Sequence, residues 1–145
     1  MSGPVVIRVA TAGVEAAASG AAAALEAGGL VVLPTDTVYG LAASLRRPDA
    51  IRAIFAAKRR PDGMALPVLV ASPEDAERLV PGALEAHDAL LRRWWPGALT
   101  VVVPASAQIP PEVTAGRATV GLREPDHPAA VAVLHAAGGA LAVTS

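Results

Sequence analysis

Cysteine and asparagine are absent from the 145 residues of this chain, and lysine occurs only once. Without cysteine, the chain can form no disulfide, no thiolate metal site and no cysteine nucleophile. Aromatic residues make up 3% of the sequence, so the core must be built mainly from Val, Leu, Ile and Ala. No apolar run reaches the roughly 18 residues of a membrane span, and residues 1–10 lack the apolar centre of a signal peptide. We therefore expect a cytoplasmic protein with no membrane partner.

The chain also has no large excess of positive or negative charge: its net charge is −1, and charged residues make up 17% of the sequence. Proteins that bind nucleic acid non-specifically are usually more basic, so any RNA contact would need a local patch. The length and the 53% hydrophobic content fit one globular domain with a sizeable core. We expect that domain to cover residues 1–145.

Short apolar runs alternate with helix signals along the chain. The expected strands are Val5–Val9, Leu30–Leu33 (buried), Leu66–Ala71 (buried), Leu99–Val103, Thr119–Arg123 and Ala140–Val143. The expected helices are Val14–Ala27, Pro48–Lys58, one that begins at Ser72-Pro73, Ala83–Trp94 and His127–Ala137. Thr35–Gly40 is expected to be a loop and Pro104–Gly116 irregular. This alternation predicts the α/β class.

Hydroxyl and carboxylate side chains follow the strand Leu30–Leu33, in the loop Thr35–Gly40. Ligands of open α/β sheets lie beyond the carboxyl ends of strands, so Thr35, Asp36 and Thr37 are placed to hold a small polar substrate. A connecting turn has the same composition, and these residues alone do not decide between the two interpretations.

Three cations, Lys58, Arg59 and Arg60, end the helix Pro48–Lys58. Cations at a helix C-terminus also stabilise the helix dipole. Lys58 is nevertheless the one lysine among 12 basic residues, and its compact ammonium suits a phosphate.

Thr119, Gly121 and Arg123 share one face of the strand Thr119–Arg123, because side chains alternate along a strand. Arg123 is either a ligand-binding residue at the strand end or half of a surface ion pair with Glu or Asp. Thr144 and Ser145 place two hydroxyls after the last strand, unless that end is frayed. Asp36, Asp62 and Asp126 are too scattered for a carboxylate metal site, and we expect none. His127 is expected to begin a helix, and Trp94 and Trp95 to pack a helix on the sheet.

Five segments, in this order, resemble the motifs of YrdC-like threonylcarbamoyl-AMP synthases. They are Gly29–Leu41, Phe55–Pro61, Trp95–Thr100, Gly121–Pro128 and Thr144–Ser145. The resemblance covers about Gly28 to Ser145 and implies a single-domain twisted mixed sheet with flanking helices and a positively charged concave face. It also implies an activity: L-threonine, bicarbonate and ATP, with Mg²⁺, give threonylcarbamoyl-AMP and pyrophosphate. That product serves threonylcarbamoyladenosine modification of tRNA, and tRNA or a tRNA-modifying transferase complex is an implied partner.

The resemblance also implies roles for single residues. Thr35 and Tyr39 would contact the substrate threonine, and Arg123 would hold its carboxylate. Lys58, Arg60 and Ser145 would be the catalytic residues that hold the ATP phosphates, and Thr119 would lie near the nucleotide.

The chain departs from the family pattern at two places. The family continues Thr-Ser-Ala-Asn-x-Ser-Gly where this chain has its final Ser145, so we expect a domain truncated at the C-terminus. Met64-Ala65 stands where the family has Lys or Asn before Pro-Leu. Two alternatives stay open: a non-catalytic nucleotide- or RNA-binding module of the same fold, and a related enzyme that uses carbamoyl phosphate.

Overall fold

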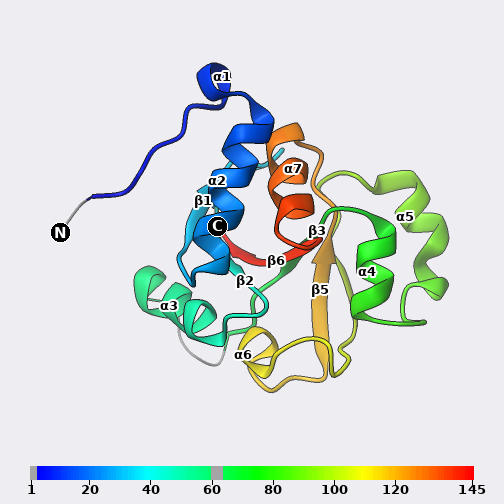
Figure 1. Ribbon diagram of the computed structural model, residues 1–145. Coiled ribbons are helices and arrows are strands. Elements are labelled where there is room, and N and C mark those ends of the chain that lie inside the picture. The colour runs from blue at the N-terminus through cyan, green and yellow to red at the C-terminus, as the bar shows by residue number, and fades with distance from the viewer. Residues whose placement is uncertain (1–2, 60–63) are drawn as a thin grey trace.

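A six-stranded sheet with helices on both faces forms the body of the protein (Figure 1). The computed structural model describes residues 3–59 and 64–145. In sheet order β1-β2-β6-β3-β5-β4, the strands are β1 (Val31–Leu33), β2 (Gly40–Ser44), β6 (Ala140–Thr144), β3 (Val68–Val70), β5 (Thr119–Arg123) and β4 (Val101–Pro104). The β3–β5 pair is parallel and the other pairs are antiparallel. The α/β class and the mixed sheet are therefore confirmed.

The helices are divided between the two faces of the sheet. They are α1 (Val9–Ala12), α2 (Val14–Glu26), α3 (Pro48–Lys58), α4 (Pro73–Leu79), the 3-10 helix η1 (Glu85–His87), α5 (Asp88–Trp94), α6 (Pro111–Thr114) and α7 (Pro128–Ala136). Side chains of α2 and α7 pack with Leu69 and Val143 on one face. Side chains of α3, α4, α5 and α6 pack with Val68 and Leu122 on the other. In the described ranges, no helix is both long and apolar enough to cross a membrane.

Local sequence signals explain where three of these helices begin. Pro48 occupies the first turn of α3, where the missing N–H has no cost. The Ser72 hydroxyl caps α4 by accepting from the Asp75 amide at 3.2 Å. His127 caps α7, because its Nδ1 accepts from the Ala129 amide at 3.2 Å. The expected helix-starting role of His127 is thus confirmed.

The face that α2 and α7 cover continues onto β5 and β4, where it opens to solvent. Val102, on β4, is 63% exposed, and it pairs with Gly121 on β5. We call this surface the open face and define it by Thr100, Val102, Thr119, Gly121 and Arg123. The prediction that Thr119, Gly121 and Arg123 share one side of a strand is confirmed by the alternating burial of β5.

Three expectations about strands were wrong. The segment Val5–Val9 was expected to be a strand, but residues 3–8 extend away from the body before α1 (Figure 1), and Val5 is 87% exposed. The strand Leu30–Leu33 was expected to be buried, but β1 is the edge strand beside β2, and only Leu33 of its residues is buried. Gly40 was assigned to a loop, but it begins β2.

Candidate functional site

Three of the predicted site residues, Thr35, Arg123 and Ser145, line one cavity of about 130 Å³. The full lining is Thr35, Val38, Gly40, Pro67, Leu69, Thr100, Arg123, Val143 and Ser145. Leu69 and Val143 belong to the face that packs against α2 and α7, whereas Thr100 and Arg123 belong to the open face. The cavity therefore lies on the sheet, at the boundary between its covered and its open part.

Thr35 and Arg123 were each expected at the carboxyl end of a strand, but these two strand ends do not lie together. The pairing β1–β2–β6–β3 is antiparallel at each step and β3–β5 is parallel, so β1 and β5 run in opposite directions. The carboxyl end of β1 consequently lies beside the amino end of β5 in the strand direction, and the carboxyl ends of the two strands point opposite ways. Thr35 and Arg123 meet because the loop after β1 and the long arginine side chain both reach over the sheet face.

The loop between β1 and β2 is held by its own hydroxyl groups. The Thr35 hydroxyl accepts from the Thr37 amide at 3.2 Å and donates to the Val38 carbonyl oxygen. Such local side-chain bonds are typical of threonine in tight turns. They fix the Thr35 hydroxyl at the cavity wall before any ligand is present.

Arg123 joins this loop to the turn before β4. Its Nε donates to the Gly97 carbonyl oxygen at 2.8 Å, its Nη1 donates to the Thr37 hydroxyl at 3.1 Å, and its Nη2 forms an ion pair with Asp36. The side chains of Arg123 and Asp36 are only 13% and 18% exposed. The alternative of an arginine–acid pair is therefore confirmed, and its arginine also lines the cavity.

Gly97 was missed as a site residue by sequence reasoning, although it lies in the Trp95–Thr100 motif. Its amide donates to the Glu124 carbonyl oxygen at 2.8 Å, and its own carbonyl accepts from Arg123. The turn follows a cis Trp95–Pro96 bond, and the buried Trp95 packs in the core as expected. Trp94, for which packing was also expected, is 51% exposed.

Glu124, which follows β5 directly, lies in an acidic environment beside the site. Burial raises the pKa of its carboxyl above the ordinary glutamate value, and the negative charges of Glu74 and Asp126 raise this pKa further. The folded protein therefore disfavours the ionised form of Glu124, which is the residue next to Arg123 in the chain.

The other predicted site residues lie outside the cavity lining. Lys58 is exposed at the end of α3, Tyr39 is 71% exposed in the loop, and Thr119 is exposed at the opposite end of β5 from Arg123. Arg60 lies outside the described residues. The structure therefore groups the expected threonine-binding residues Thr35 and Arg123 with Ser145, and the roles given to Lys58, Arg60, Tyr39 and Thr119 stay predictions.

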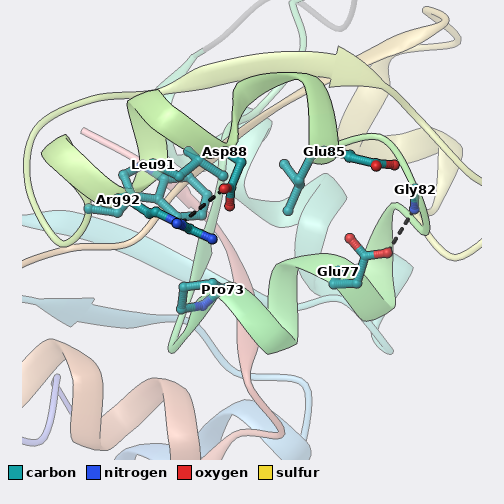
Figure 2. A pocket seen from close by; sticks show the side chains of 9 residues that line it. Pro73, Glu77, Gly82, Glu85, Asp88, Leu91 and Arg92 are labelled. Atoms are coloured by element: carbon teal, nitrogen blue, oxygen red, sulfur yellow. Dashed lines mark hydrogen bonds and ion pairs between the residues drawn. The ribbon is translucent and has the colours of Figure 1, made fainter.

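A larger hollow of about 430 Å³ lies between α4 and α5 (Figure 2). Two pairs already occupy polar groups of its lining: Arg92 Nε lies 2.9 Å from an Asp88 carboxylate oxygen, and Glu77 accepts from the Gly82 amide at 2.8 Å. Its lining residues are Pro73, Glu77, Gly82, Leu84, Glu85, Asp88, Leu91, Arg92 and Trp95. Because the sequence motifs converge on the smaller cavity instead, we place the candidate site there despite its size.

Comparisons with known proteins agree with the motifs. The family model Sua5_yciO_yrdC, described as "Telomere recombination", matches residues 23–145. Threonylcarbamoyl-AMP synthase of Bacillus subtilis is 42% identical over 126 residues, which are 86% of this chain and 36% of that protein. Threonylcarbamoyl-AMP synthase of Thiobacillus denitrificans is 41% identical over 134 residues, which are 90% and 70% of the two chains.

A solved structure extends the comparison to three dimensions. P. abyssi Sua5 complexed with L-threonine superposes with a TM-score of 0.84 at 38% identity, over 88% of this chain and 38% of that chain. The present chain thus spans a little over a third of the B. subtilis and P. abyssi proteins. With a family model that matches 23–145 and the fold of a solved member, the chain belongs to the Sua5/YciO/YrdC family.

Proposed function

We propose that this chain carries the reaction centre of an L-threonylcarbamoyladenylate synthase. In this reaction L-threonine, bicarbonate and ATP give threonylcarbamoyl-AMP and pyrophosphate. One observation carries the proposal: Thr35, Arg123 and Ser145, from three separate motifs, line a single cavity. The relatives compared above are threonylcarbamoyl-AMP synthases at about 40% identity, which supports the same chemistry.

The dimensions of the cavity favour an amino acid as its occupant. Pockets that enclose drug-sized ligands measure roughly 300–1,000 Å³, and this cavity of about 130 Å³ is smaller. The floor of Leu69 and Val143 offers an apolar contact for a methyl group, and Arg123 offers N–H donors for a carboxylate. We assign this cavity to L-threonine, with the Thr35 hydroxyl as a further contact and Tyr39 at its rim.

With threonine in the cavity, the nucleotide must bind beside it. The open face adjoins the cavity, because Thr100 and Arg123 belong to both. We propose that ATP, which enters as its Mg²⁺ complex, lies there near Thr119. Its phosphates would be held by Lys58, Arg60 and Ser145. Displacement at the α-phosphate builds charge on phosphate oxygens, and fixed cations offset that charge.

The attacking group is the carboxylate that bicarbonate adds to the amine of threonine, with loss of water. One oxygen of this carbamate bonds to the α-phosphorus while the bond to the pyrophosphate oxygen breaks. No covalent enzyme intermediate is needed. The principal contribution of the protein is to hold the carbamate against the α-phosphate.

The test measures pyrophosphate release with ATP, Mg²⁺ and bicarbonate, in the presence and absence of L-threonine. We expect release only when both L-threonine and bicarbonate are present, and we expect Arg123→Gln to abolish it. Arg52→Gln is the matched control, because Arg52 lies on α3 and pairs with Glu112 at 3.4 Å. Release that does not depend on threonine would contradict the proposal.

A second candidate function follows from the cavity lining, which includes Thr35 and Arg123 but not Lys58. The cavity can bind L-threonine even if the chain does not turn ATP over, which would make it a non-catalytic binding module. Calorimetric binding of L-threonine without pyrophosphate release would identify that case. In either case we propose that the partner is a tRNA-modifying system. That system would consume the threonylcarbamoyl-AMP that a synthase makes, or receive the L-threonine that a non-catalytic module binds.

A further inference from the structure

The guanidinium of Arg123 has a protein partner on each of its three nitrogens. Gly97 accepts from Nε at 2.8 Å, Thr37 accepts from Nη1 at 3.1 Å, and Asp36 pairs with Nη2. A guanidinium carries five N–H groups, so three are used and two are left for a ligand. The side chain is 13% exposed and Arg123 lines the cavity, so the two remaining donors belong to a residue at the cavity wall.

Of these three partners, Asp36 alone carries a charge. Enclosing a guanidinium to this degree is unfavourable unless an anion compensates it. Thr37 and Gly97 supply neutral oxygens, which accept from the guanidinium but bring no negative charge to offset its positive one. The carboxylate of Asp36 is therefore the partner that keeps the Arg123 side chain folded over the sheet.

From these contacts we propose that Asp36 is a positioning residue for carboxylate recognition: it fixes the Arg123 guanidinium so that its two remaining N–H groups face the cavity. The proposal rests on the assignment of the cavity to L-threonine. Asp36 itself does not contact the substrate. It removes the cost of ordering a long arginine side chain at the moment of binding.

The direction in which the affinity for L-threonine changes separates positioning by Asp36 from a competing electrostatic effect. Asp36 is negative, and so is the carboxylate of threonine, so removing the charge of Asp36 removes a Coulomb repulsion and would by that effect alone strengthen binding of the carboxylate. If Asp36 acts by positioning, its removal weakens binding instead. The two effects predict opposite changes in the same measured affinity.

The first experiment is calorimetric titration of Asp36→Asn with L-threonine and with L-threonine amide, which lacks the carboxylate. We expect the affinity for L-threonine to fall about tenfold, the scale of one hydrogen bond to a charged group. The affinity for the amide should change little. Asp36→Glu, which keeps the charge, should recover part of the loss. An unchanged or higher affinity of Asp36→Asn for L-threonine would overturn the proposal.

The matched control is Asp49→Asn, because Asp49 also faces an arginine, at 3.7 Å from Arg47 Nε, but with a side chain that is 62% exposed. This control should bind L-threonine as the wild type does. In an Arg123→Gln background, Asp36→Asn should have almost no further effect, because the partner through which it acts is gone. An equal loss in both backgrounds would also count against positioning.

A second experiment separates this proposal from the assignment of threonine. In the ligand-free protein, the signal of the Arg123 Nη2 proton that pairs with Asp36 should be resolved in nitrogen-15 NMR spectra and slow to exchange with water. Asp36→Asn should make this proton exchange faster, and Asp49→Asn should not. If the wild type binds no threonine, the proposed function fails, while this measurement still decides whether Asp36 holds Arg123. An unchanged exchange rate in Asp36→Asn would show that it does not.

Discussion

Gly40 lies against the side chain of Val143, so closely that a Cβ atom on Gly40 would overlap Cγ1 of Val143. Gly40 begins β2 and Val143 belongs to the neighbouring β6, and both residues line the cavity. A β-branched neighbour cannot rotate its end away as a flexible chain would. The close approach of β2 and β6 at the cavity floor therefore depends on glycine at this position.

Gly40→Ala should lower the free energy of unfolding by about 1–3 kcal/mol, the usual cost of overpacking. Urea denaturation measures this change. In a Val143→Ala background the same substitution should cost clearly less, because the overlapping methyl group is gone. Gly3→Ala is the control, since a Cβ at Gly3 meets nothing within 4 Å. Equal costs in both backgrounds would argue against the overlap.

Trp95→Phe should destabilise the protein by about 1 kcal/mol or more. The indole N–H of Trp95 donates to the Leu99 carbonyl oxygen at 2.8 Å, and phenylalanine leaves that acceptor without its donor. Thermal denaturation provides the measurement. Trp94→Phe is the matched control, because Trp94 is 51% exposed and its loss should change stability by less than about 0.5 kcal/mol. Similar effects of both substitutions would contradict this account of the Trp95 turn.

Glu124→Gln should stabilise the protein at pH 7 and leave it nearly unchanged at low pH. The pKa of Glu124 is raised in the folded state by burial, Glu74 and Asp126, so its contribution to stability is present below the ordinary glutamate pKa. That contribution is lost as the pH rises through the raised value. Glutamine stays neutral and avoids this loss.

Denaturation of wild type and Glu124→Gln at several pH values between 3 and 8 tests the sign. The gain at pH 7 should shrink in a Glu74→Gln background, because one of the repelling charges has been removed. A variant that is less stable than the wild type at pH 7 would show that the Glu124 carboxylate makes a favourable interaction instead.

Lys58→Ala should weaken ATP binding by about tenfold and change L-threonine binding much less, because Lys58 is assigned to a phosphate and loses a charge-assisted contact. Calorimetry with each ligand alone measures the two affinities. Arg52→Ala removes a cation from the same helix and should affect neither ligand. Equal losses for ATP and threonine would remove the phosphate role from Lys58.

Helices with clear local signals could be predicted well from the sequence. Pro48–Lys58 is a helix with the predicted bounds, because a proline at its start and apolar residues at helical spacing are local features. The strand Thr119–Arg123 also has its predicted bounds. Its alternation correctly placed Arg123 on the same side as Thr119.

Features that depend on distant pairing could not be predicted in this way. Val5–Val9 has the composition of a strand, yet its β-branched residues lie outside the sheet, because a strand forms only with a partner. Conversely, Gly40–Ser44 is a strand composed of small residues and one leucine, and it forms because β1 and β6 flank it.

The candidate site also depends on contacts between distant parts of the chain, which the sequence does not reveal. The residues Thr35, Arg123 and Ser145 were identified from their motifs, but the contact of Arg123 with Asp36 joins positions 87 apart. That contact depends on opposite strand directions, which no local pattern encodes. The role of Gly97 as an acceptor was invisible for the same reason, since only its backbone takes part.

The place of β6 in the sheet has a consequence for how the chain acquires its fold. β6 follows the other five strands in sequence, yet it lies between β2 and β3 and joins the β1–β2 pair to the β3–β5–β4 group. Until residues 140–144 have been synthesised and inserted, both β2 and β3 present unpaired edges to other chains. Closure of the sheet is thus a late, long-range step, and such steps are slow. We expect the nascent chain to be most prone to aggregation just before that closure.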